Sequence, residues 1–154
     1  MNVLAYTSPA RGHLYPVVPI LGELVSRGHR AHACTLSTEL DKVAAIGVGA
    51  EAIDPLIEAI EIEDWRARSL PGRTRSVFAT LSARARLEAP DLLRAIERHD
   101  PDVLLVDVNC WGAATVAEAS GRPWAVYSPY LLPLRSRDAP PFGLGMRPRT
   151  DRLG

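Results

Sequence analysis

The composition of this 154-residue chain excludes several classes of protein before any motif is considered. Eighteen basic and eighteen acidic residues leave no net charge, and 47% of the residues are hydrophobic. The basic residues are scattered singly, whereas a nucleic-acid-binding protein gathers them in a stripe or patch. The length fits one folded domain, and the composition is that of a globular protein.

Cysteine usage and hydropathy indicate the compartment. Cys34 and Cys110 lie in different predicted segments, and the first residues lack the charged and apolar regions of a secretory signal. The apolar run 103–108 is much shorter than the ~20 residues that a membrane-spanning helix needs. We therefore expect a reduced, cytoplasmic protein without a membrane span.

The first residues predict a buried strand, a loop and an amphipathic helix. The apolar run 3–6 is ended by the loop Ser8-Pro9-Ala10-Arg11-Gly12. From Leu14 onward, apolar residues recur on one helical face until Gly28 stops the helix. Pro16 suits the first turn of that helix, where a missing N–H group costs nothing.

The next segment predicts two further strands around a short helix. Residues 30–36 read as a strand, and 50–53 as a weaker one. Between them, residues 38–41 have the pattern of a capping box that opens a short helix ending at Gly47. Residues 54–72 show poor periodicity, so we expect a loop or irregular helices there.

The second half of the chain repeats the alternation of helix and strand. Residues 74–98 predict helix, either kinked or divided in two by Pro90. The continuous apolar run 103–106 is typical of a parallel strand covered on both faces. A helix over 113–120 and a strand over 124–127 follow.

This order of elements predicts an α/β fold: a doubly wound, mostly parallel sheet with helices on both faces, of the Rossmann-like kind. We assign residues 1–130 to this domain. Residues 131–154 are rich in proline and glycine and predict a loop or the start of a linker.

Two polar residues are predicted at the edge of the sheet where ligands bind in such folds. His13 follows the first strand, and Asp107 ends a strand that we expect beside it. A carboxylate behind a histidine fixes the imidazole tautomer, so that the outer nitrogen acts as a general base. We expect the two side chains within hydrogen-bond reach or one water apart. On spacing alone, a helix-capping histidine and a solvated aspartate remain open.

Motifs for cofactors and metals are not found in the sequence. The loop 8–12 has neither the three glycines of a dinucleotide-binding loop nor the Gly-Lys-Ser/Thr of a phosphate-binding loop. His29 and His32 would point to different faces of the chain, so we expect solvated histidines, and His99 reads as a helix-end residue. We expect no cofactor and no metal.

Two blocks of sequence resemble the UDP-glycosyltransferase-like enzymes of the GT-B fold, especially bacterial enzymes that glycosylate macrolides and other natural products. The first block comprises Gly12-His13, Pro16, Leu21, Leu24 and Arg27-Gly28-His29. The second comprises residues 101–107, then Ala117-Glu118 and Gly121-Arg122-Pro123. The resemblance spans residues 1 to about 130.

The resemblance implies the N-terminal, acceptor-binding half of an inverting glycosyltransferase of hexosyltransferase type in natural-product or antibiotic biosynthesis. His13 would deprotonate an acceptor hydroxyl, and Asp107 would orient His13. The nucleotide-sugar donor, a co-substrate, would bind mainly to a C-terminal domain beyond the linker 131–154. The expected partners are a hydroxylated small molecule, the nucleotide sugar and that C-terminal domain. By itself the chain would be inactive or nearly so.

Further residues in loop and cleft segments are candidates for binding the acceptor, since aromatic walls suit a flat, apolar molecule. For Phe78 and Leu81, the alternative to acceptor binding is ordinary helix packing. For Asn109, the alternative is a role as the N-cap of the next helix. Likewise, the arginines of the long helix either guide a phosphate or form a solvated face; they are Arg73, Arg75, Arg84 and Arg86. The acceptor candidates are Pro9, Ala10, Trp65, Phe78, Leu81, Asn109, Trp111, Ser128 and Tyr130.

The competing hypothesis is a non-catalytic binding or partner domain of Rossmann-like fold that needs a separate chain. A receiver-like domain is a weaker alternative. It would need paired acidic residues after the first strand and a lysine late in the fold, whereas Lys42 is the only lysine.

Overall fold

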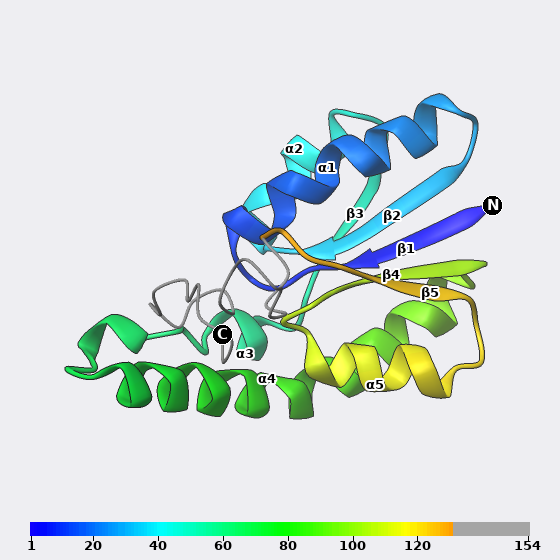
Figure 1. Ribbon diagram of the computed structural model, residues 1–154. Coiled ribbons are helices and arrows are strands. Elements are labelled where there is room, and N and C mark those ends of the chain that lie inside the picture. Colours follow the sequence, from blue (N-terminus) through cyan, green and yellow to red (C-terminus); the bar gives the residue numbers. More distant parts are fainter. Residues whose placement is uncertain (131–154) are drawn as a thin grey trace, which may run out of the picture.

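The computed structural model describes residues 1–130, which form a five-stranded, all-parallel sheet between two layers of helices (Figure 1). The strand order is β3-β2-β1-β4-β5, so the sheet is doubly wound as predicted. The strands are β1 (Asn2–Tyr6), β2 (Arg30–Thr35), β3 (Gly49–Ala52), β4 (Val103–Asp107) and β5 (Trp124–Tyr127). The segment 131–154, predicted to be a loop or the start of a linker, lies outside the described residues.

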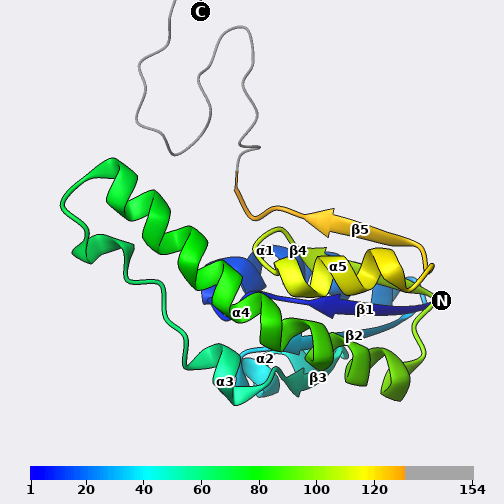
Figure 2. The ribbon, with the colours of Figure 1, turned by 90° about the horizontal axis from the view of Figure 1, so that it is seen from below.

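The helices divide between the two faces of the sheet, as Figures 1 and 2 show. One face is covered by α1 (Arg11–Ser26) and α2 (Leu40–Ala44). The other is covered by α3 (Pro55–Glu58), α4 (Leu70–His99) and α5 (Trp111–Ala119). Two 3₁₀ turns, Ser37–Glu39 and Asp64–Arg66, complete the regular structure. No helix within residues 1–130 has both the length and the apolarity to cross a membrane.

Each face of the sheet has its own hydrophobic core. Beneath α1, Leu14, Val17 and Leu21 are fully buried because their offsets of 0, 3 and 7 place them on one helical stripe. On the opposite face, Leu92 of α4 and Ala113 of α5 pack against the central strands. Burial of a Val or Leu side chain contributes about 1.5–3 kcal/mol, so both layers hold the sheet firmly.

Helix α1 begins earlier than the sequence predicted. It starts at Arg11, so His13 lies in its first turn rather than in the preceding loop, and Pro16 lies beyond that turn. The reason is that the backbone of Ala10 already accepts hydrogen bonds from the N–H groups of His13 and Leu14. The loop after β1 is therefore only four residues long, from Thr7 to Ala10.

The predicted capping box at residues 38–41 is wrong. A 3₁₀ turn precedes α2, and neither has a side-chain cap. The Glu39 carboxylate instead accepts hydrogen bonds from Lys42 and Tyr15 at 2.8 Å and from Arg11 at 2.6 Å. These contacts, with Lys42 the strongest, lower the pKa of Glu39 to about 2. Glu39 thus ties α2 to the first turns of α1.

Helix α4 is one continuous element of 30 residues that includes Pro90, so the alternative of two helices divided at Pro90 is wrong. Ser69 caps its start, accepting a hydrogen bond from the N–H of Gly72, and Asp100 ends it in the left-handed region at φ 40°. Its first half projects past the carboxyl ends of the strands, whereas its second half packs beneath the sheet (Figures 1 and 2). The irregular stretch before it contains only α3 and a 3₁₀ turn, as expected.

The two cysteines are separated by the fold. Cys34 lies near the carboxyl end of β2, and Cys110 directly precedes α5. Both are buried and free of disulfide bonds.

Candidate active site

His13 and Asp107 meet at the carboxyl edge of the sheet because β1 and β4 are neighbouring parallel strands. Asp107 is the last residue of β4, and the first turn of α1 brings His13 over it. His13 Nδ1 lies 2.8 Å from Asp107 Oδ2, which confirms the predicted proximity. The Asp107 side chain is fully buried and that of His13 is 15% exposed, so only the imidazole reaches the surface.

The contacts of Asp107 define the tautomer of His13. Asp107 Oδ1 accepts a hydrogen bond from the backbone N–H of Asn109 at 2.8 Å, while Oδ2 faces the imidazole. An ionised carboxylate can only accept hydrogen bonds, so Nδ1 of a neutral His13 carries the proton and donates it. The Nε2 atom then keeps a lone pair, which is what a general base needs.

Asn109 and Tyr130 surround the outer nitrogen of His13. The Asn109 amide nitrogen lies 3.4 Å from His13 Nε2, and the Tyr130 hydroxyl donates to Asn109 Oδ1 at 2.6 Å. The Tyr130 ring also meets the imidazole edge-on, with ring centroids 5.5 Å apart. Cys110, not Asn109, is the N-cap residue of α5. The N-cap alternative for Asn109 is therefore wrong, and its side chain faces the histidine.

Tyr127 is a site residue that the sequence analysis did not select. It is paired with Asp107 in the register of β4 and β5, and its hydroxyl donates to the backbone oxygen of His13 at 3.3 Å. Burial, followed by the nearby Asp107 carboxylate, raises the pKa of Tyr127. Its position, at the end of the strand next to β4, is the signal that identifies it.

The other acceptor candidates divide into three environments. Phe78 and Trp111 pack together with ring centroids 5.4 Å apart, joining the projecting half of α4 to the start of α5. Leu81 is only 4% exposed, which fits the helix-packing alternative. Trp65 is 68% exposed and stacks with the Arg66 guanidinium.

The remaining candidates lie close to the dyad in the chain or in space. Pro9 and Ala10 directly precede the helix that carries His13. Ser128 donates from its hydroxyl to the backbone oxygen of Tyr130 at 2.9 Å, so it braces the residue that holds Asn109. The structure thus gathers His13, Asp107, Asn109 and Tyr130 into one contact network, with Phe78 and Trp111 as a separate aromatic pair.

A buried glutamate supports this edge from below and was also missed. Glu88 of α4 accepts a hydrogen bond from the backbone N–H of Gly112 at 2.9 Å, at the start of α5. Burial raises its pKa to about 7, against the opposing effect of the Gly112 and Ala113 N–H groups and of Arg84. Arg84 is itself buried and donates to the backbone oxygen of Ile60, so the solvated-face interpretation is wrong for this arginine.

Comparisons with known proteins agree with this fold. The chain is 33% identical to 4'-demethylrebeccamycin synthase of Lentzea aerocolonigenes, over 99% of this chain and 38% of that protein. It is 25% identical to the solved glycotransferase of kitacinnamycin, with a TM-score of 0.67, over 86% of this chain and 32% of the other. It is 26% identical to a spinosyn rhamnosyltransferase solved with spinosyn aglycone, with a TM-score of 0.61, over 84% and 34% of the two chains. No protein-family model matches.

This chain is therefore related in sequence and fold to bacterial natural-product glycosyltransferases of the GT-B type, and it has their Rossmann-like α/β architecture. It spans only about a third of the length of these relatives.

Proposed function

We propose that this chain is the acceptor-binding domain of an inverting glycosyltransferase that transfers a sugar from a nucleotide sugar to a hydroxyl of a small natural product. The observation that carries the proposal is the 2.8 Å contact between His13 Nδ1 and the buried Asp107 carboxylate. It fixes a tautomer with a basic Nε2 at the edge where ligands bind in this kind of fold. Kinship with proteins named as glycosyltransferases supplies the reaction class.

In the proposed reaction, His13 Nε2 takes the proton of the acceptor hydroxyl. The oxygen attacks the anomeric carbon of the donor sugar while the bond from that carbon to the nucleoside diphosphate breaks, and the configuration inverts. The diphosphate leaves with the bonding electrons. Asp107 stabilises the imidazolium that forms and never needs to accept the proton itself. The nucleotide sugar takes part as a co-substrate, and the proposed step invokes no cofactor.

The acceptor would lie against the dyad and the aromatic pair. Trp111 and Phe78 offer apolar surface, and Tyr130 and Asn109 offer polar groups beside His13 Nε2. Apolar walls with a few placed polar groups are typical of small-molecule sites. We assign the sugar donor mainly to a further, C-terminal domain joined through residues 131–154, because the loop after β1 has no phosphate-binding glycines.

Calorimetry on the 154-residue chain tests the division of labour. A flat, apolar molecule with a free hydroxyl should bind and should lose affinity in a Trp111→Ala variant, whereas a nucleotide sugar should bind poorly. Tight nucleotide-sugar binding without a response to hydroxylated acceptors would overturn the assignment to the acceptor.

The alternative of a non-catalytic partner domain is distinguished by reconstitution. The chain alone should transfer little or no sugar, and adding a separately made donor domain with nucleotide sugar should restore turnover that depends on His13. Turnover that is the same with His13→Ala would favour the partner role.

A further inference from the structure

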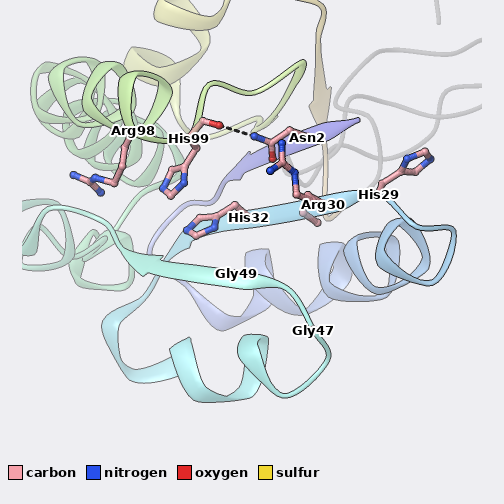
Figure 3. A pocket seen from close by; sticks show the side chains of 9 residues that line it. Asn2, His29, Arg30, His32, Gly47, Gly49, Arg98 and His99 are labelled. Carbon is pink, nitrogen blue, oxygen red and sulfur yellow. Dashed lines mark hydrogen bonds between the residues drawn. The ribbon is translucent and has the colours of Figure 1, made fainter.

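The amino-terminal edge of the sheet, opposite the His13–Asp107 site, holds a cavity of about 480 Å³ (Figure 3). Its lining includes Asn2 of β1, His32 of β2 and Gly49 of β3, together with Arg98 and His99 at the end of α4. The sheet and the end of α4 meet here, and nothing in the proposed glycosyl transfer uses this edge.

Two histidines that line this cavity and a carboxylate beside them come together from three elements. His32 and His99 stack with ring centroids 3.8 Å apart, and Glu51 of β3 lies beside them. One ligand atom from each of the three residues can be chosen so that all lie within 4.8 Å of one another. The Asn2 amide donates to the backbone oxygen of His99 at 2.5 Å, which fixes the end of α4 against β1 (Figure 3).

One ring nitrogen of this cluster is unsatisfied. Within residues 1–130, His32 Nε2 is buried without a hydrogen-bond partner. His99 Nε2 is also buried, and its contact is the Glu51 carboxylate, whose Oε2 lies 3.2 Å away. Buried polar atoms normally have partners, so the unpaired nitrogen of His32 beside this His99–Glu51 pair calls for a ligand.

The three side chains are of the types that bind zinc. Two imidazoles and one carboxylate form the donor set of a zinc ion that keeps one coordination position open.

Gly49 provides the room for the His32 ring. A Cβ atom at this position would overlap His32 Nδ1, so the imidazole lies directly against the Gly49 backbone. The register of β2 and β3, which pairs these two residues, creates the contact. Any side chain at residue 49 would therefore push the ring away from His99.

We propose that His32, Glu51 and His99 bind a divalent transition-metal ion, with zinc as the expected metal, at the amino-terminal edge of the sheet. The ion would clamp β2, β3 and the end of α4 together, and it would stabilise the folded state because it binds that state in preference to the unfolded chain. Arg98, which also contacts Glu51 Oε2, competes with the ion for the carboxylate.

Titration of metal-free chain with Zn²⁺, followed by calorimetry, and with Co²⁺, followed by visible absorption, tests the proposal. One ion per chain should bind. His32→Ala and His99→Ala should each lower the affinity for Zn²⁺. Loss of a residue that only hydrogen-bonds to a metal ligand costs roughly 10–100-fold in affinity, so loss of a ligand itself should cost at least as much. Gly49→Ala should also weaken binding although it removes no ligand, and Arg98→Ala should tighten it. Circular dichroism checks that each variant is folded.

His29→Ala is the matched control. His29 lines the same cavity, but its Nδ1 lies 3.4 Å from the N-terminal amine and it points away from the pair (Figure 3). This variant and His13→Ala should bind zinc like the parent chain. If the parent chain does not bind one Zn²⁺ ion, the assignment is overturned. It is also overturned if His29→Ala loses as much affinity as His32→Ala, because the ion would then lie at the N-terminal amine. Neither result bears on glycosyl transfer.

Discussion

The two edges of the sheet each bring histidine and carboxylate side chains together, yet their contacts differ. At the carboxyl edge, one nitrogen of His13 is committed to a fully buried Asp107 and the other faces the Asn109 amide and the surface. At the amino edge, His99 Nε2 faces the Glu51 carboxylate, and His32 Nε2 is buried without a hydrogen-bond partner among residues 1–130. The comparison teaches why we propose different roles for the two edges. A histidine whose inner nitrogen is held by a buried carboxylate suits proton transfer, whereas two adjacent imidazoles beside a carboxylate, one of them with an unpaired nitrogen, suit a metal ion.

The largest expected effect separates the edges by activity. His13→Ala in the complete enzyme, with its donor domain, should lower kcat by roughly 10²–10⁴-fold, the usual contribution of a positioned general base. Steady-state kinetics with a hydroxylated acceptor measures it. His29→Ala, at the other edge, should leave kcat unchanged. Full turnover without His13 would move the role of base to another group.

The next effect tests how the carboxyl edge is supported. Gly112, at the start of α5, lies so close to α4 that an added Cβ atom would overlap the backbone of Ala85. Because backbone cannot move aside cheaply, Gly112→Ala should lower the free energy of unfolding by about 1–3 kcal/mol or more.

Urea denaturation measures the effect of Gly112→Ala. Gly12→Ala is the control, since a Cβ atom there meets nothing within 4 Å. The Gly112 variant should still bind zinc at the amino edge. Equal stabilities of the two variants would show that α4 and α5 are packed less closely than the structure has them.

A pH dependence should follow from Glu88 beneath the carboxyl edge. Its folded pKa of about 7 lies above the ordinary value, so the folded state holds a proton that the unfolded chain has lost. The contribution to stability is present at acidic pH and disappears as the pH rises through about 7, by at most about 1.4 kcal/mol per pH unit. Comparing urea denaturation of the parent chain and Glu88→Gln between pH 5 and 8 isolates this slope; parallel curves would contradict it.

The smallest effect has the opposite sign and belongs to the amino edge. The pKa of His32 is lowered by burial, by His99 and by Arg98, against the opposing effect of Glu51. The unfolded chain therefore takes up a proton first, and stability is lost as the pH falls below the ordinary histidine pKa of about 6.5. In metal-free chain, His32→Gln should reduce this loss between pH 7 and 5. An unchanged acid limb of the stability curve would show that the ring is not desolvated.

Sequence periodicity determined most of the fold by itself. Continuous apolar runs marked β1 and β4, and the stripe of Leu14, Val17 and Leu21 marked α1, because burial on a sheet face forces these patterns on the chain. Local signals were less reliable at element ends. The pattern at residues 38–41 resembled a capping box, but Thr38 lies inside the 3₁₀ turn Ser37–Glu39, so it is not the residue that precedes α2 and cannot cap that helix.

For the sites, the sequence determined the residues that lie next to a strand end, and the tertiary structure decided the rest. His13 and Asp107 were predicted together because parallel neighbouring strands end at one edge. The register of β2 with β3 and the position at which α4 ends bring together His32, Glu51 and His99. Neither can be predicted from a local sequence pattern. The same holds for Glu88, whose carboxylate finds its partner at Gly112 only once α4 and α5 are packed. Contacts between separate elements depend on packing geometry, which a single sequence encodes only through the whole fold.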